Sequence, residues 1–446
     1  MYENRLTDAD TLRAIAYLGN RTNVGYLAIP LPQQNGVRNA GGIPDLDRVF
    51  GGLGIRWTRQ AELAGGPLTF TTGLDYDRAD EDRKGYRNEL GVQGALKRDE
   101  QNLVDSWGGY VQGEWRISDP WSLSLGLRYT EVRFESSDDF ICTDTVNTTG
   151  TALGTCSGTT NAVTAASNTW NPDDSGSKTY SAWTPVGGLV YRVSPALNLY
   201  GNLGQSFETP TFIELAYRPD GSSGLNFDLE PSLSNHYELG MKAFVGGDTR
   251  VNLSVFQIDT QDEIVVATNA GGRATYRNAG DTQRRGVELL VDSPFAAGFG
   301  GYVAATYIDA TFQDSFLSCG PPPCPTPTLT VDSGNSIPGI PACQVYAELN
   351  WRHTSGLTAA VEGGWRSKVY VNDRNTEFAE EFFVLNLRAG FQRSVGAWKL
   401  GAFVRVDNLL DERYIGGVIV NDGNGRFYAP APTSTLLVSA TAGYQF

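Results

Sequence analysis

The chain has 446 residues, of which 50 are acidic and 35 basic, giving a formal net charge of −15. This acidic balance argues against a nucleic-acid partner, which needs a basic surface. Hydrophobic residues make up 40% of the chain, which excludes bulk disorder, and no window approaches the 18 apolar residues of a transmembrane helix. Glycine (52), tyrosine (20) and phenylalanine (20) are plentiful and methionine (2) is scarce, a composition typical of β structure.

Segments that alternate apolar and polar residues recur along the whole chain and predict about sixteen β-strands. They are longer than the five or six residues usual in soluble sheets and suit tilted membrane-crossing strands, which need about nine to eleven residues. The predicted strands are 11–22, 48–64, 67–83, 103–118, 121–137, 179–194, 195–210, 235–247, 249–267, 283–294, 298–313, 341–354, 357–371, 381–394, 397–410 and 433–446.

The connections between these strands alternate between short and long. Short ones include Gly65-Gly66, Asp119-Pro120 and 246–248. Tight turns at one end and long loops at the other are the organisation of outer-membrane β-barrels, and a soluble sandwich or propeller has no reason to keep this parity. The long connections are 23–47, 84–102, 138–178, 211–234, 268–282, 314–340, 372–380 and 411–432.

The final strand shows which face meets lipid. Residues Leu436 to Phe446 place Leu, Val, Ala, Ala, Tyr and Phe on one face and mostly small or polar residues on the other. In 235–247 and 381–394, charged residues such as Glu238 and Arg388 share the face opposite the apolar side chains. A charge at the bilayer midplane costs roughly 2–4 kcal/mol, so these residues are expected to line a lumen, which in so large a barrel is too wide for its own side chains to fill.

Five motifs in the second half of the chain resemble those of TonB-dependent outer-membrane receptors. Residues 207–215 (FETPTFIEL) are similar to F-x-x-P-x-x-x-E-L, and 425–432 (GRFYAPAP) leads into the last strand much as in ferric-siderophore members. The remaining similar segments are 229–232 (LEPS) with 237–242 (YELGMK), 277–280 (RNAG) with 284–288 (RRGVE), and 406–414 (VDNLLDERY).

The resemblance implies an all-β transmembrane antiparallel barrel in the outer membrane of a Gram-negative cell. The family has 22 strands and a plug, so residues 1–446 are expected to be one barrel domain, truncated to its last sixteen strands. The start, MYENRLTDADTL, has neither the basic nor the apolar region of a signal peptide, and neither the plug nor the energy-coupling box of the family is recognisable. A sixteen-strand porin is the structural alternative.

The implied function is binding and energised uptake of a ferric-siderophore-like chelate, with no catalysis and no intrinsic cofactor. The implied partners are outer-membrane lipid, the TonB–ExbB–ExbD complex acting through the plug, and the barrel-assembly machinery, which would read Phe446. Alternatives are uptake of a vitamin, a quinone-like cofactor or an oligosaccharide, passive diffusion through a porin, and adhesion, because fold alone does not fix the ligand.

Candidate ligand contacts lie near the mouths of strands. Arg284 and Arg285 could meet an anionic chelate through charge-assisted hydrogen bonds, or could pair with carboxylates of the barrel wall. His236 faces the expected lumen and is either a ligand contact or a polar residue of the rim.

The last long loop adds four more candidates. Tyr414, Arg426, Phe427 and Tyr428 suit an aromatic or anionic chelate, or they belong to the aromatic girdle at the membrane surface. With only two histidines in the chain and no G-x-S-x-G segment, a hydrolase site is not predicted.

The five cysteines predict disulfides rather than a zinc site, because none forms a C-x-x-C pair. Cys142 with Cys156 and Cys319 with Cys324 are close in sequence inside polar loops. Cys343 is left over and could equally pair with Cys319 or Cys324. No D-x-D-x-D-G spacing supports a calcium loop in 138–178, so no metal site is predicted.

Overall fold

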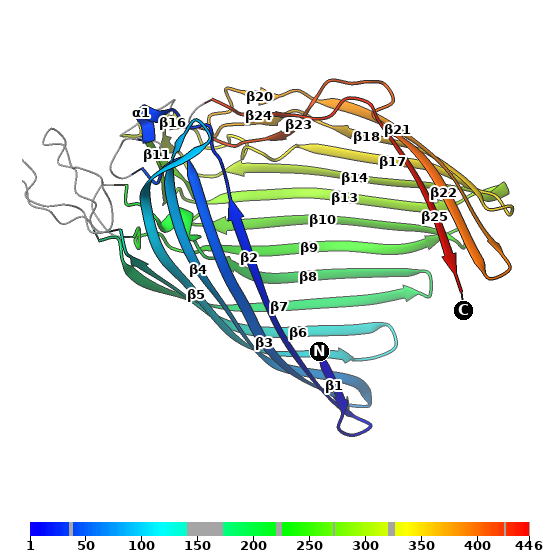
Figure 1. Cartoon of the computed structure of the whole chain (residues 1–446). Helices are drawn as coiled ribbons and strands as arrows, with labels where there is room; N and C mark the ends of the chain where they lie inside the picture. Colours follow the sequence, from blue (N-terminus) through cyan, green and yellow to red (C-terminus); the bar gives the residue numbers. More distant parts are fainter. Residues whose placement is uncertain are drawn as a thin grey trace, which may run out of the picture.

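The computed structural model describes residues 1–34, 39–140, 173–219, 225–270, 273–319, 326–422 and 425–445. Seventeen of their strands form one antiparallel sheet in which each strand pairs with the next in chain order (Figure 1). These strands are β1 (Tyr2–Arg5), β2 (Asp10–Val24), β3 (Ile43–Leu63), β4 (Gly66–Glu89), β5 (Val92–Arg116), β6 (Trp121–Asp138), β7 (Gly176–Ser194), β8 (Leu197–Glu208), β9 (Ser232–Val245), β10 (Thr249–Gln261), β13 (Thr282–Pro294), β14 (Phe299–Phe312), β17 (Cys343–Arg352), β18 (Leu357–Arg366), β21 (Phe382–Val395), β22 (Trp398–Asp407) and β25 (Thr435–Tyr444).

All sixteen predicted strands are present, and the short β1 is additional. The long connections contain elements that the alternation did not predict. These are α1 (Leu31–Gln34), α2 (Phe212–Leu215) and four two-stranded hairpins: β11 (Ile264–Ala270) with β12 (Arg273–Asn278), β15 (Phe316–Ser318) with β16 (Leu329–Val331), β19 (Val369–Tyr370) with β20 (Phe378–Ala379), and β23 (Ile415–Val418) with β24 (Tyr428–Pro430).

Short and long connections lie at opposite ends of the strands, which we call the turn rim and the loop rim. At the turn rim, Ala64 and Gly65 have φ values of 51° and 80°, as a two-residue type I′ hairpin requires. Between β13 and β14 the turn is a single 3-10 turn, Ala296–Gly298.

The prediction of a loop over 84–102 is wrong. There β4 and β5 continue to a two-residue turn at Leu90-Gly91 and form one tall hairpin. Its residues are polar, which suggested a loop, but Lys84 and Asp99 oppose each other across the strands with nitrogen and oxygen 3.9 Å apart. Cross-strand pairs of opposite charge stabilise a sheet, so the ladder persists beyond the apolar part of the strands.

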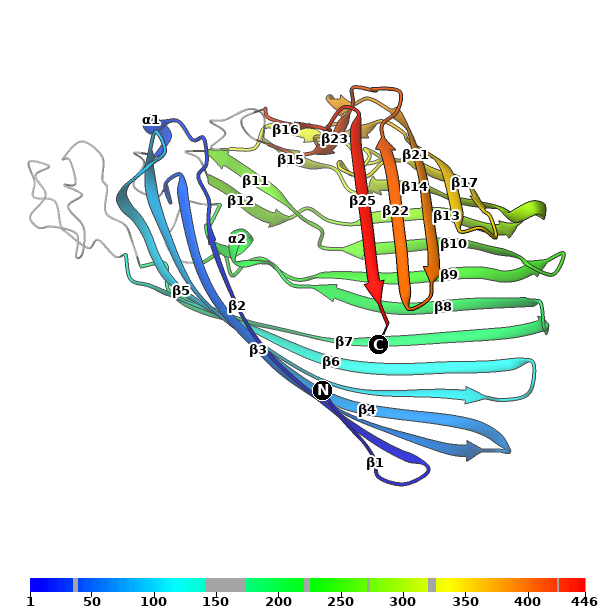
Figure 2. The same cartoon turned by 45° about the vertical axis from the view of Figure 1, so that its right-hand side comes forward.

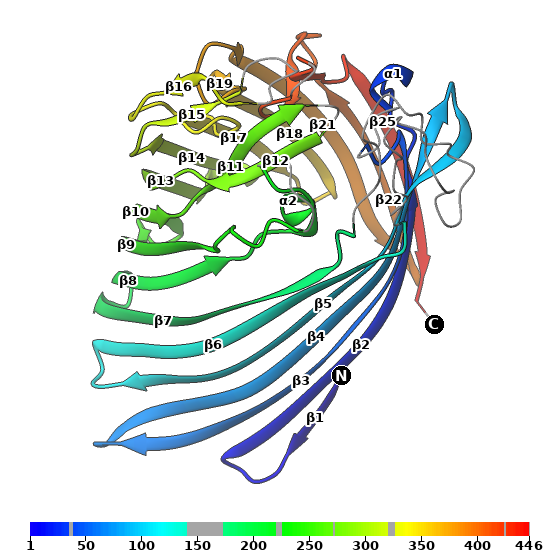
Figure 3. The ribbon, with the colours of Figure 1, turned by 90° about the vertical axis from the view of Figure 1, so that its left-hand side faces the viewer.

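The two faces of the sheet differ in polarity, as predicted. Leu239 opposes Val255, which opposes Val287, so apolar side chains line up on one face, the outer face. Leu239 is 65% exposed and Val438 of the last strand is 64% exposed. The other face, the inner face, is concave (Figure 3) and carries most of the buried or half-buried charges described below.

The sheet is curved but not closed among the described residues. Strand β25 pairs with β22, and β2 pairs with β1 and β3, with no ladder joining β25 to β1 or β2 (Figure 2). Within the same ranges, no helix is long and apolar enough to cross a membrane.

Two hydrophobic clusters attach loops to the inner face near the loop rim. The helix cluster joins α2 and its loop to β6 and β7; its buried residues are Phe134, Tyr180, Leu215 and Leu229. The hairpin cluster attaches β15 and β16 to β14; its buried residues are Val265, Ala310, Phe312, Phe316, Val331 and Ile337. These loops therefore fold inward over the concave side, where α2 and the β11–β12 hairpin are visible in Figure 3.

The helix cluster explains the 207–215 motif. Thr211 is the N-cap of α2: its hydroxyl accepts from the Glu214 amide at 3.4 Å, and the Glu214 carboxylate accepts from the Thr211 amide at 2.7 Å. This reciprocal arrangement is a capping box. It presents Leu215, which has no exposed surface, to the sheet.

Replacing Thr211 by alanine is expected to destabilise α2 by about 1 kcal/mol, because one amide loses its acceptor. Hydrogen exchange of the amides from 212 to 216 should become about fivefold faster. Thr211→Ser, which keeps the hydroxyl, is the matched control, and equal exchange in the alanine and serine variants would contradict the assignment of the cap.

Candidate ligand-binding rim and lumen wall

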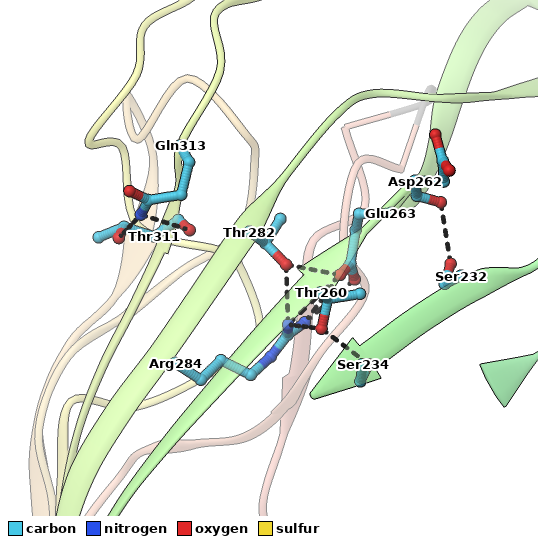
Figure 4. Close-up of polar contacts among 9 residues, drawn as sticks. All are labelled: Ser232, Ser234, Thr260, Asp262, Glu263, Thr282, Arg284, Thr311 and Gln313. Carbon is cyan, nitrogen blue, oxygen red and sulfur yellow. Dashed lines mark hydrogen bonds and ion pairs between the residues drawn. The ribbon is translucent and has the colours of Figure 1, made fainter. Parts of the chain in front are cut away.

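Arg284 lies on the inner face and is fully engaged by the protein. Its Nη2 is 3.0 Å from Oε1 of Glu263, and its Nη1 donates to Oγ1 of Thr282 at 2.9 Å and of Thr260 at 3.4 Å (Figure 4). The Thr282 hydroxyl donates to the same carboxylate at 2.8 Å. Arg284 therefore forms an ion pair with Glu263, a carboxylate of the connection between β10 and β11, and a role for Arg284 as a ligand contact stays a prediction.

Arg285 points to the other side of the sheet. It opposes Gln257 and Asp309, and its Nη2 is 2.9 Å from Oδ2 of Asp309. Consecutive residues of a strand face opposite sides, so the predicted arginine pair is split, and Arg285 belongs to the outer face.

His236 lies on the inner face of β9, as the alternation predicted. Its Nε2 is 2.9 Å from the hydroxyl of Ser206 on β8, which lies two residues from Gly204, the residue directly opposite His236. The other histidine, His353, stacks on Trp351 at the turn rim, with ring centroids 5.4 Å apart. His236 is half-buried and its ring is available on the inner side.

The four candidates of the last loop lie on and around the β23–β24 hairpin. Tyr414 packs on Phe382, with centroids 4.1 Å apart, and Arg366 stacks on the same Phe382 ring at 4.6 Å. Arg426 is exposed, and its backbone amide donates to Asp422 at 2.6 Å. Tyr414 thus packs at the base of the β23–β24 hairpin, whereas the Arg426 guanidinium is largely in solvent.

Phe427 and Tyr428 lie at the start of β24, with ring centroids 6.2 Å apart. The Tyr428 hydroxyl donates to the carbonyl of Phe378 at 3.1 Å, which joins β24 to the β19–β20 hairpin. The sequence therefore predicted one half of an aromatic surface whose other half comes from a different loop.

That other half consists of residues that no sequence motif marks. Lys368 Nζ lies 4.8 Å from the ring of Tyr370 and 5.1 Å from the ring of Phe378, and it donates to the Tyr370 hydroxyl at 3.0 Å. We call Lys368, Tyr370, Phe378 and Tyr428 the rim patch. The only sequence signal was the spacing of Arg366, Lys368 and Tyr370 at every second position, which a plain strand also shows.

Asparagine side chains hold three loops together behind the rim patch. Asn421 Nδ2 donates to Asp373 at 2.9 Å, Asn335 Nδ2 donates to the carbonyl of Asp373 at 3.0 Å, and Asn375 Nδ2 donates to the carbonyl of Ser336 at 2.8 Å. We call this set the asparagine lock. Burial raises the pKa of the Asp373 carboxyl, while the hydrogen bond from Asn421 opposes that shift.

An ion-pair network covers the inner face at the C-terminal end of the sheet. Glu362 accepts from Arg405 at 2.8 and 2.9 Å and lies 2.9 Å from Arg388. Arg388 also contacts Glu348 at 2.8 Å, and Arg405 contacts Asp407 at 2.7 Å. These residues come from β17, β18, β21 and β22, so four strands share one charged wall.

The chain matches the family model of the TonB dependent receptor-like β-barrel over residues 2–409. It belongs to the TonB-dependent receptor family. This is a family of transport receptors, in agreement with the absence of a predicted catalytic site.

Individual receptors are distant relatives. The chain is 22% identical over 315 residues to the probable TonB-dependent siderophore receptor PiuA of Acinetobacter baumannii, covering 70% of this chain and 37% of that protein. It is 27% identical over 194 residues to the ferrioxamine B receptor of Salmonella typhimurium, covering 42% of this chain and 25% of that protein. The chain thus spans less than half the length of these curated relatives.

Solved structures of receptors share the fold. The unliganded ferric citrate transporter FecA superposes with a TM-score of 0.73 at 14% identity, covering 99% of this chain and 60% of that one. The siderophore receptor PiuA from Acinetobacter baumannii also gives 0.73, at 16% identity, with 99% and 63% covered.

The cysteine predictions are met only in part by the described residues of the receptor chain. Cys319 is disulfide-bonded, whereas Cys142, Cys156 and Cys324 lie outside the described residues. Cys343, the first residue of β17, is a free thiol, so neither alternative considered for it, a bond to Cys319 or to Cys324, is formed. Cys343 opposes Tyr307 on the outer face, while Cys319 follows β15 of the hairpin cluster.

The described ranges contain no group of three or more His, Cys, Asp or Glu side chains arranged to hold a metal ion. Acidic side chains of the inner side form ion pairs with arginines, as Glu263 and Glu362 illustrate.

Proposed function

We propose that this chain is the barrel of an outer-membrane receptor that binds a ferric-siderophore-like chelate for uptake energised by TonB–ExbB–ExbD. The observation that carries the proposal is the rim patch, in which a lysine and three aromatic rings from two loops meet at the loop rim of the family's barrel. Family membership and the printed names of the relatives, siderophore and ferrioxamine B receptors, support the choice of ligand.

The chemistry of the rim patch suits such a ligand. Aromatic rings offer an apolar face for contact and a polar edge. A cation held over the rings attracts anions and acyl or catechol oxygens. Loops folded onto the inner face keep these groups in place, so the loss of conformational entropy on binding is smaller. The iron would enter as part of the transported chelate.

The remaining partners follow from the same proposal. The exposed apolar outer face is suited to outer-membrane lipid. The energy complex would act through the receptor's plug. Phe446, proposed as the residue read by the barrel-assembly machinery, lies outside the described residues.

Replacing Lys368 and Tyr428 together by alanine is expected to weaken chelate binding about tenfold, because cation–π and aromatic contacts contribute about 0.5–1.5 kcal/mol each. Radioactive iron uptake from a panel of ferric siderophores, in iron-starved cells with and without tonB, measures the effect. Tyr2→Ala, which removes an exposed tyrosine of β1, is the control.

Uptake that persists without tonB would contradict the proposal. So would a large unplugged conductance of the full-length receptor in liposomes, because that is the behaviour of a passive porin.

A further inference from the structure

A second polar cluster lies on the inner face of the tall β4–β5 hairpin. Glu81 opposes Asn102, and Arg83 opposes Glu100 on the neighbouring strand. Ala79 and Val104, on the same face two positions along, lead to Phe134 of the helix cluster. The cluster therefore lies inside the barrel, beside the loop that α2 anchors.

Most charges of this cluster are paired within the protein. Arg48 donates to Glu81 at 2.9 Å, and Arg98 contacts Glu100 at 2.8 Å and donates to the Tyr217 hydroxyl. Asp138, opposite Glu100, accepts from the backbone amides of two loop residues, at 2.9 and 3.2 Å.

Two groups of the cluster have no such partner. The half-buried Arg83 donates no hydrogen bond and makes no ion pair with any described residue, although it lies within electrostatic range of Arg98, Glu100 and Glu81. The side chain of Asn102 is only 3% exposed, and its Oδ1 accepts no hydrogen bond from any described group. A buried acceptor without a donor costs about 1–3 kcal/mol, so both groups indicate a polar partner that comes from elsewhere.

Their chemistry defines that partner. The carboxylates near Arg83, Glu81 and Glu100, are each engaged by another arginine, so the Arg83 guanidinium can bind a further carboxylate through two parallel hydrogen bonds. An amide oxygen needs a donor such as a hydroxyl. Arg83 and Asn102 are diagonal neighbours across the two strands, a relation that places side chains about 7–8 Å apart and within reach of one small molecule.

We propose that Arg83 and Asn102 form a subsite for a hydroxycarboxylate arm of a ferric chelate, with the carboxylate on Arg83 and the hydroxyl on Asn102. This assignment rests on the proposed function, and it specifies the class of chelate that binds in the lumen. It lies apart from the rim patch, on strands of the opposite half of the chain.

Binding of ferric citrate to the full-length receptor in outer-membrane vesicles tests the subsite, with ferrichrome, an uncharged ferric trihydroxamate, as the second probe. Arg83→Gln is expected to weaken ferric citrate binding at least tenfold and to leave ferrichrome binding unchanged. Asn102→Leu should lower ferric citrate affinity severalfold, and Arg83→Lys should retain part of it. Arg285→Gln, on the outer face, is the control and should change neither.

Equal ferric citrate affinity in the wild type and Arg83→Gln, or no binding of ferric citrate by the wild type, would overturn the subsite. Either result leaves the proposed function standing if tonB-dependent uptake of another ferric siderophore is measured. Equal loss of both probes in Arg83→Gln would also overturn the subsite, because it would indicate a structural role for the arginine.

Discussion

Replacing Glu362 by leucine is expected to destabilise the folded barrel by about 3 kcal/mol or more. Glu362 is 5% exposed and bridges Arg388 and Arg405, which oppose each other directly across β21 and β22. Without the carboxylate, two guanidiniums face each other on adjacent strands, where like charges are destabilising. Glu348 would still pair with Arg388, and Asp407 would still pair with Arg405, but neither carboxylate lies between the two guanidiniums.

The measurement is urea-induced unfolding of the full-length receptor in detergent micelles, followed by tryptophan fluorescence. Asp407→Ala, which removes a more exposed partner of Arg405 from the same network, is the control and should cost no more than about 1 kcal/mol. Removing Glu362, Arg388 and Arg405 together in favour of apolar residues should recover much of the loss, because buried ion networks can be exchanged for apolar packing at little cost. A Glu362→Leu variant as stable as the wild type would contradict the role assigned to the network.

Leu215→Ala is expected to release the α2 loop from the inner face. Leu215 has no exposed surface and packs in the helix cluster with Phe134 and Leu229. Truncating a buried leucine costs about 2–5 kcal/mol of stability. Here it lowers the stability of a short loop element and leaves the strand pairing of the barrel unchanged. The loop should therefore open locally while the strands remain paired.

Limited proteolysis within 209–219 and hydrogen exchange of the α2 amides measure this opening. Ile213→Ala is the matched control, since Ile213 lies in the same helix but is 60% exposed; it should change stability by less than about 0.5 kcal/mol. Equal protease sensitivity of the two variants would show that the helix cluster does not hold the loop.

The strands could be predicted from the sequence because their signal is local. A period of two, repeated over ten or more residues, fixes both the strand and its faces, as the apolar row from Leu436 in β25 illustrates. The tall β4–β5 hairpin was missed because polarity marks contact with water, and a strand that extends beyond the membrane is as polar as a loop.

The candidate site was predicted only in part because it depends on contacts between distant segments. Tyr428 was singled out from its own loop, but its hydrogen-bond partner Phe378, and Lys368 over the Phe378 ring, come from another segment of the chain. The split of Arg284 and Arg285 follows from strand alternation alone, whereas the partner of Arg284, Glu263, depends on how the β10–β13 connection folds.

The asparagine lock has a consequence for how receptors of this kind diversify. Asn335, Asn375 and Asn421 belong to three different connections, yet each hydrogen-bonds to the backbone or side chain of a neighbouring one. A change in the length of the 372–380 connection would remove a hydrogen-bond partner from both other loops, and a change in either of those would remove one from 372–380. New ligand specificity at this end of the barrel is therefore expected to be inherited as a set of three loops, and chimaeras that exchange one loop alone should lose order in its neighbours.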